Sequence, residues 1–97
     1  MPKGYWITWY RSVADPKRLA EYAALATPAI EAAGGRFLSR GPAAKTYEGV
    51  DNQRTVLIEF ESITHAIAAY TSPKYQAALQ VLKGAVERDV RILQGLE

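Results

Sequence analysis

Residues 5–10 read Tyr-Trp-Ile-Thr-Trp-Tyr, an aromatic and β-branched run that is typical of a β-strand. Side chains along a strand point in turn to the two faces of its sheet. Both sets are large here: one comprises Tyr5, Ile7 and Trp9, and the other comprises Trp6, Thr8 and Tyr10. A sheet face that meets water normally carries polar side chains. We therefore expect this strand to belong to a sheet that is covered on both faces.

The composition is that of an ordinary folded domain. Of the 97 residues, 48% are hydrophobic and 23% are charged, and the net charge is +2. This mixture is too apolar for a disordered chain. No apolar run reaches the roughly 18 residues of a membrane span, and the N-terminus lacks the features of a signal peptide. We expect a single domain over residues 1–97, located in the cytoplasm and without a membrane partner.

Residue counts exclude several chemistries. The chain has no cysteine and one histidine, which rules out disulfide frameworks, thiolate zinc sites and thiol nucleophiles and argues against multi-histidine metal sites. The glycine motifs of phosphate-binding loops and the G-x-S-x-G motif of serine hydrolases do not occur. We expect no metal and no cofactor.

Three helix starts are marked in the sequence. Asp15-Pro16 and Ser72-Pro73 each pair an N-capping side chain with a proline at the first helical position, and Ser62 is a third cap. Pro28 is expected to kink or restart the first helix. The apolar stripe of the last helix is expected to continue through Gly84 to Val86.

Other segments predict strands at residues 36–40, 54–61 and 88–93, with a weakly extended stretch at 44–50 and a polar turn at 51–53. Without the weak stretch the order is β-α-β-β-α-α-β, which matches a split pair of β-α-β units. We therefore predict an α+β fold: a ferredoxin-like plait whose four-stranded antiparallel sheet is covered by helices on one face.

The second sheet face is predicted to meet another copy of the chain. Besides the apolar side chains of residues 5–10, Leu57 and Leu93 fall outside the positions that face the helices. A partner sheet stacked on this face gives a homodimer of the dimeric α/β barrel type. The alternative is an exposed, partly apolar sheet face.

Short motifs along the chain resemble one protein family. They are Lys3-Gly4-Tyr5-Trp6, Gly34-Gly35-Arg36-Phe37-Leu38 with Arg40-Gly41, Tyr47-Glu48-Gly49, Ile58-Glu59-Phe60 with Ser62, and Ser72-Pro73-Lys74-Tyr75-Gln76. Together they resemble domain-of-unknown-function family 1330 over nearly the whole chain. The resemblance implies a ferredoxin-like dimeric α/β barrel, similar to that of small monooxygenases, and implies no particular reaction. Pro42 stands where the family commonly has glycine, and Glu61 where it commonly has proline.

Charged residues supply the first candidates for a site. Glu59 shares strand parity with Leu57, so it is expected on the covered face, where a carboxylate needs a partner. Arg40 ends the second strand and is expected to reach it. Glu48 is a further candidate ligand-binding carboxylate, and a turn residue is the alternative reading. For Arg40 and Glu59 the alternative is a structural ion pair or a solvated strand end.

Aromatic residues and the histidine supply the rest. A ligand cavity could be floored by Tyr5, Trp6, Trp9, Tyr10, Tyr22, Tyr70 and Tyr75, although such residues also build cores and interfaces. Tyr22 and Tyr70 are the ligand-binding candidates of this set, although they lie on helix faces directed at the sheet, where core residues belong. The candidate catalytic residues are Arg40, Glu59 and His65. His65 could act as a general base if it reaches a cavity, and it is a solvent-exposed residue otherwise.

Two functions fit the sequence. The first is a dimeric barrel that binds a small organic molecule between sheet and helices, with cofactor-independent oxygenation or isomerisation as a reaction suggested by the fold. The second is a non-catalytic stress, regulatory or protein-interaction module. A large cavity edged by Arg40 and Glu59 favours the first, and a filled interior favours the second. Nucleic acid is not an expected partner, because Glu59 and Glu61 lie on the strand where an RNA-recognition domain is basic.

Overall fold

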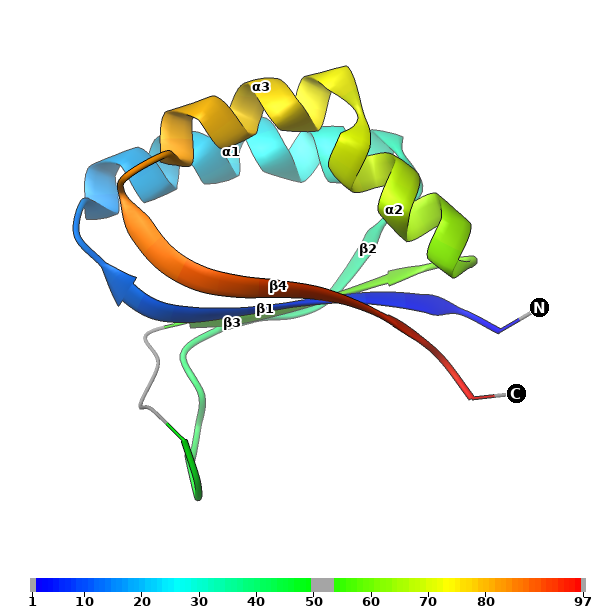
Figure 1. The fold of residues 1–97 in the computed structure, drawn as a ribbon, viewed down its shortest axis with the longest axis horizontal. Coiled ribbons are helices and arrows are strands. Elements are labelled where there is room, and N and C mark those ends of the chain that lie inside the picture. Colours follow the sequence, from blue (N-terminus) through cyan, green and yellow to red (C-terminus); the bar gives the residue numbers. More distant parts are fainter. Residues whose placement is uncertain (1, 50–53, 97) are drawn as a thin grey trace.

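The structure is a computed structural model that describes residues 2–49 and 54–96. Its elements are β1 (Gly4–Val13), α1 (Pro16–Ala32), β2 (Arg36–Gly41), β3 (Arg54–Phe60), α2 (Ile63–Thr71), α3 (Pro73–Leu82) and β4 (Val86–Gln94). The strands form one antiparallel sheet in the order β2-β3-β1-β4, and the helices lie over one face of it (Figure 1). The predicted α+β ferredoxin-like fold is confirmed.

The core lies between the helices and the even-numbered side chains of β1. Trp6 is 1% exposed, and its ring lies 4.9 Å from that of Tyr75 in α3 and 6.4 Å from that of Phe60 in β3. Small residues of the helices, among them Ala26, Ala66 and Ala78, are also buried. They allow the helices to approach the sheet closely, so that large aromatic side chains fill the layer between them.

All three predicted helix caps form. Asp15, Ser62 and Ser72 each accept a hydrogen bond from the backbone N–H three residues along the chain. Ser72 also donates its hydroxyl proton to the carbonyl oxygen of Ala69, the last turn of α2. One serine therefore ends α2 and begins α3, which fixes the angle between two helices that pack on the sheet.

The helices differ from expectation at two places. α1 does not restart at Pro28 but continues through it; Pro28 is exposed on the same side as Ala24, so the carbonyl group that loses its hydrogen bond can meet water. α3 ends at Leu82, because Gly84 adopts a positive φ of 80° and turns the chain, and Val86 already belongs to β4.

The connection from β2 to β3 also differs from expectation. Residues 44–49 form no strand, and the expected turn at 51–53 lies outside the described residues. The described part of this connection extends away from the helices, beyond the opposite face of the sheet (Figure 1). That opposite face carries Tyr5, Ile7 and Trp9, which are half-buried in the single chain.

Among residues 2–49 and 54–96, no helix combines the length and hydrophobicity needed to cross a membrane.

Replacing Ser72 with alanine is expected to lower the free energy of unfolding by about 0.5–2 kcal/mol, because α3 loses its N-cap hydrogen bond. Urea denaturation followed by circular dichroism measures this change. Ser39→Ala is the control, since Ser39 is exposed on β2, and it is expected to change stability by less than about 0.5 kcal/mol. Equal effects of the two substitutions would contradict the assigned role of the cap.

Candidate functional site

A small cavity lies between α1 and the sheet, and every strand contributes to it. Its volume is about 30 Å³, and its lining comprises Trp6, Thr8 and Tyr10 of β1, Tyr22, Ala23, Ala26, Thr27 and Ile30 of α1, Phe37 and Arg40 of β2, Arg54, Val56 and Ile58 of β3, and Arg88 of β4. This is the space of about one ordered water molecule or one polar group of a ligand. The lining combines apolar side chains with three arginines.

Arg88 forms the polar centre of this region. Its Nη1 donates to the hydroxyl groups of Tyr10 and Tyr22, both at 3.3 Å, and its Nη2 donates to the hydroxyl group of Tyr75 at 3.0 Å. The hydroxyl groups of Tyr22 and Tyr75 lie 2.7 Å apart and share a further hydrogen bond. The guanidinium group also lies 5.6 Å from the ring centre of Tyr10 and 5.2 Å from that of Tyr22. We call these four residues the Arg88 cluster.

The protonation states of the Arg88 cluster follow from burial. Burial raises the pKa of Tyr10, Tyr22 and Tyr75, even though the nearby Arg88 guanidinium acts in the opposite direction. Burial lowers the pKa of Arg88, but the three phenol groups raise it more, so that the net shift is upward. At neutral pH the cluster is therefore one cation surrounded by three neutral phenols.

Two further arginines approach the same cavity. The Nε atom of Arg54 is buried and has no hydrogen-bond partner within the described part of the chain. Arg40 is exposed, stacks its guanidinium 4.3 Å from the ring centre of Phe37, and donates from Nη1 to the hydroxyl oxygen of Thr27 at 3.0 Å. Arg40 therefore marks the place where the cavity reaches the surface.

The cavity has no carboxylate in its lining. The ion pairs among residues 2–49 and 54–96 are Lys3–Glu61, Arg11–Asp89, Arg36–Glu59 and Arg91–Asp89, and none of them includes a cavity arginine. As far as the described residues show, the site thus holds three arginines and no internal counter-ion. Within the same residues there is no group of three or more acidic or histidine side chains placed to hold a metal ion.

The structure brings together some of the expected site residues and separates others. Trp6 and Tyr10 of the aromatic set line the cavity. Tyr22 and Arg40 both line the cavity. Glu59 lies on the opposite face of the sheet, where it accepts a hydrogen bond from Tyr5 at 3.1 Å and pairs with Arg36. The expected contact between Arg40 and Glu59 does not form.

A β-bulge explains that separation. Phe37 pairs with Ile58, but the register shifts before Ser39, which pairs with Leu57, and Arg40 then pairs with Val56. Because Val56 faces the helices, the extra residue in β2 places Arg40 on the helix side, opposite to Glu59.

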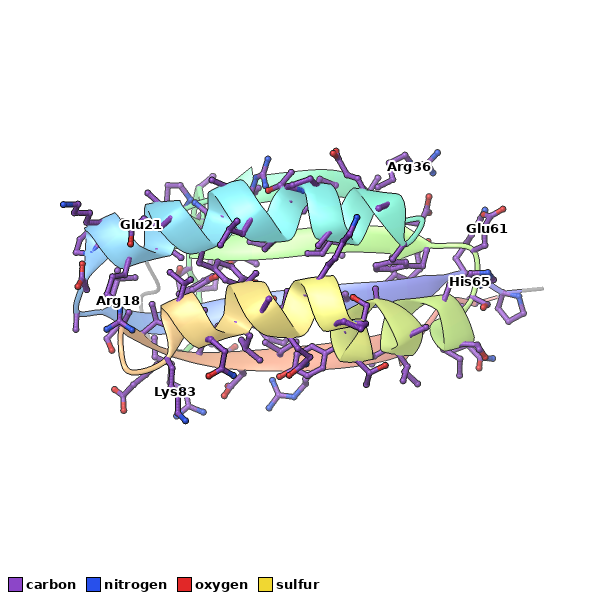
Figure 2. The ribbon with its side chains drawn as sticks, turned by 90° about the horizontal axis from the view of Figure 1, so that it is seen from above. Arg18, Glu21, Arg36, Glu61, His65 and Lys83 are labelled. Atoms are coloured by element: carbon purple, nitrogen blue, oxygen red, sulfur yellow. The ribbon has the colours of Figure 1, made fainter. Side chains whose placement is uncertain are left out.

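The remaining candidates lie outside the cavity lining. Tyr70 packs its ring 5.5 Å from that of Trp6 and 5.2 Å from that of Tyr75, behind the cavity. Glu48 is exposed in the connection between β2 and β3 and borders a surface depression with Trp9. His65 is exposed at the start of α2, with its Nδ1 atom 2.7 Å from the hydroxyl oxygen of Ser62, at the same end of the molecule as Glu61 (Figure 2).

Arg54 and Arg88 are the charged cavity residues that sequence reasoning did not single out. Their signal is strand parity, because Arg88 alternates with Val90 and Ile92, and Arg54 alternates with Val56 and Ile58. An arginine in the helix-facing register of a strand is expected to bury its side chain and therefore to need polar partners.

Known structures share this fold. A protein of unknown function from Rhodopseudomonas palustris is similar with a TM-score of 0.78 and 17% identity, over 99% of this chain and 84% of that one. A dimeric ferredoxin-like protein of unknown function from Jannaschia sp. CCS1 has a TM-score of 0.75 and 17% identity, over 94% and 97% of the two chains. SnoaB, a cofactor-independent oxygenase from Streptomyces nogalater, has a TM-score of 0.72 and 9% identity, over 100% and 96%.

At these identities the likeness concerns the fold. No curated protein matches the sequence significantly. The model of one family, described as a domain of unknown function (DUF1330), matches residues 3–96. The chain therefore belongs to the DUF1330 family, as the motifs in its sequence indicated.

Proposed function

We propose that this protein binds a small organic molecule whose polar end enters the cavity between α1 and the sheet. The observation that carries the proposal is the Arg88 cluster, a partly buried cation held by three hydroxyl groups beside a cavity. An apolar side chain at position 88 would carry a smaller free-energy penalty, because a charge that is removed from water loses its hydration. Local departures from the most stable packing are typical of functional sites.

The cavity residues also supply a means of catalysis. Guanidinium and phenol groups that are fixed in a desolvated site stabilise negative charge as it develops on a substrate oxygen. SnoaB is described as a cofactor-independent oxygenase, and a reaction of that class on the bound molecule is the catalytic form of the proposal.

The binding unit is proposed to be a homodimer formed through the sheet face opposite the helices. Tyr5, Ile7 and Trp9 lie in the central strand of this face, with Leu57 beside Ile7 and with Leu93, 49% exposed, beside Tyr5. The similar protein from Jannaschia is described as dimeric. A second copy stacked on this face would remove these apolar side chains from water.

The connection between β2 and β3 supports the same arrangement. Its described part extends beyond the sheet on the side of the proposed partner (Figure 1), and it carries Tyr47, which is 88% exposed. The Tyr47 side chain and the residues around it are proposed to pack against the partner subunit.

A second candidate function is a non-catalytic dimeric module that regulates or binds another protein. The observation in its favour is the small cavity, about 30 Å³, which leaves the interior nearly filled. The two candidates differ in whether small molecules bind between α1 and the sheet.

Filling the cavity is expected to abolish small-molecule binding. Ala23→Leu adds apolar volume to the cavity lining, whereas Ala24→Leu makes the same change at an exposed position of the same helix. Saturation-transfer NMR with a panel of small carboxylates, phenols, amides, alcohols and amines measures binding, and circular dichroism verifies folding. Binding by the wild-type protein and Ala24→Leu, with loss in Ala23→Leu, is the expected pattern. If no compound binds, or if Ala23→Leu binds equally well, the non-catalytic function is the better account.

Charge on the proposed dimer face is expected to produce monomers. Ile7→Arg places a cation at the centre of that face, and Ile67→Arg makes the identical change on α2, where Ile67 is 50% exposed. Sedimentation equilibrium at micromolar concentration should give twice the 10.7 kDa chain mass for the wild-type protein and Ile67→Arg, and the chain mass for Ile7→Arg. A monomeric wild-type protein would contradict the proposed interface.

A further inference from the structure

We infer that the cavity selects an organic oxyanion, a molecule whose carboxylate, enolate or phenolate oxygen enters between Arg54 and the Arg88 cluster. The inference rests on the proposed function and adds the charge and polar chemistry of the ligand. It follows from the hydrogen-bond donors that the cavity presents, from its charge and from its size.

The Arg88 cluster has more donors than acceptors. Each of its three hydroxyl oxygens accepts from Arg88, and the hydrogen bond between Tyr22 and Tyr75 uses one phenolic proton. Two of the three phenolic protons, that of Tyr10 and one of the Tyr22–Tyr75 pair, therefore lack an acceptor in the described part of the chain. A ligand that supplies an acceptor would satisfy them.

The other polar groups of the lining add to this excess of donors. Thr8 is 2% exposed, and its hydroxyl oxygen already accepts from the indole N–H of Trp6 at 2.9 Å. Its own proton has no acceptor among the described residues, and neither has the buried Nε–H of Arg54. Thr27 likewise accepts, from Arg40. The hydrogens left without an acceptor among the described residues are therefore the Nε–H of Arg54 and hydroxyl protons around the cavity, and a carboxylate offers about four acceptor positions for them.

Charge selects the same ligand. Arg40, Arg54 and Arg88 approach one cavity whose lining holds no carboxylate. Cations that share a partly desolvated site without a counter-ion repel one another. An anion bound between them offsets this repulsion and supplies the hydrogen-bond acceptors that the cations lack. A bound ammonium group would be repelled, and a neutral amide would gain only part of the stabilisation.

Size restricts what enters. About 30 Å³ accommodates an oxygen-bearing group rather than a whole organic molecule. The rest of the ligand would leave the cavity beside Arg40, the exposed lining residue, and lie against Phe37, whose ring is half-buried there. The site thus fits a molecule with one anionic end and a planar or apolar remainder.

Matched probes test the inference. Benzoate and benzamide have similar shape and differ in charge, as do propionate and propionamide, and isothermal titration calorimetry measures their affinities. The variants are Arg54→Met and Arg88→Met, and the control is Lys17→Met, which removes one positive charge from an exposed position of α1, away from the cavity lining and from the proposed dimer face. Melting temperatures of the ligand-free proteins give a second readout, because Arg54 has an unpartnered buried group whose removal should not lower stability.

The expected result is binding of the carboxylates in preference to the amides. Carboxylate affinity is expected to fall about tenfold or more in both cavity variants and to change little in Lys17→Met. The melting temperature of Arg54→Met should equal or exceed that of the wild-type protein. Equal binding of acid and amide, or full carboxylate affinity in Arg54→Met, overturns the inference and leaves the proposed function standing. Failure of every probe to bind counts against both, and the cavity-filling pair then decides the proposed function.

Discussion

The guanidinium group of Arg88 joins four elements of the fold. It extends from β4 and donates to Tyr10 of β1, Tyr22 of α1 and Tyr75 of α3. Each phenol gains a hydrogen bond that compensates for its burial, and the cation gains three partners that compensate for its own. The cluster therefore orients the two long helices relative to the central strands, and the same contacts place the cavity beside it.

The two faces of the sheet have different roles. The helix-facing side chains of β1 build the core and the cavity, while Tyr5, Ile7 and Trp9 form an apolar surface on the opposite side. Both sets lie on one strand, so a homodimer through the second face would hold the strand that carries Trp6, Thr8 and Tyr10 rigidly. In this way dimer formation would stabilise the shape of a cavity that it does not touch.

Much of the fold could be predicted from local patterns, and the site could be predicted only in part. Capping residues and strand alternation are local signals, so Asp15, Ser62 and Ser72 marked the helix starts correctly. The bulge in β2 has no local sequence signal, and it reversed the expected relation of Arg40 to Glu59. The Arg88 cluster joins residues distant in sequence, such as Tyr10 and Arg88, whose meeting depends on strand order.

In the proposed complex, an anionic oxygen of the ligand binds between Arg54 and the Arg88 cluster. Nitrogen-15 NMR of the arginine Nε–H groups tests this directly, because a charge-assisted hydrogen bond to a carboxylate moves the proton resonance downfield and slows its exchange with water. On addition of benzoate, the account predicts such a change at Arg54, larger than at Arg18 of α1, whose Nε–H already donates to the carbonyl oxygen of Val81. An unchanged Arg54 resonance at saturating benzoate, or equal shifts at both residues, would contradict it.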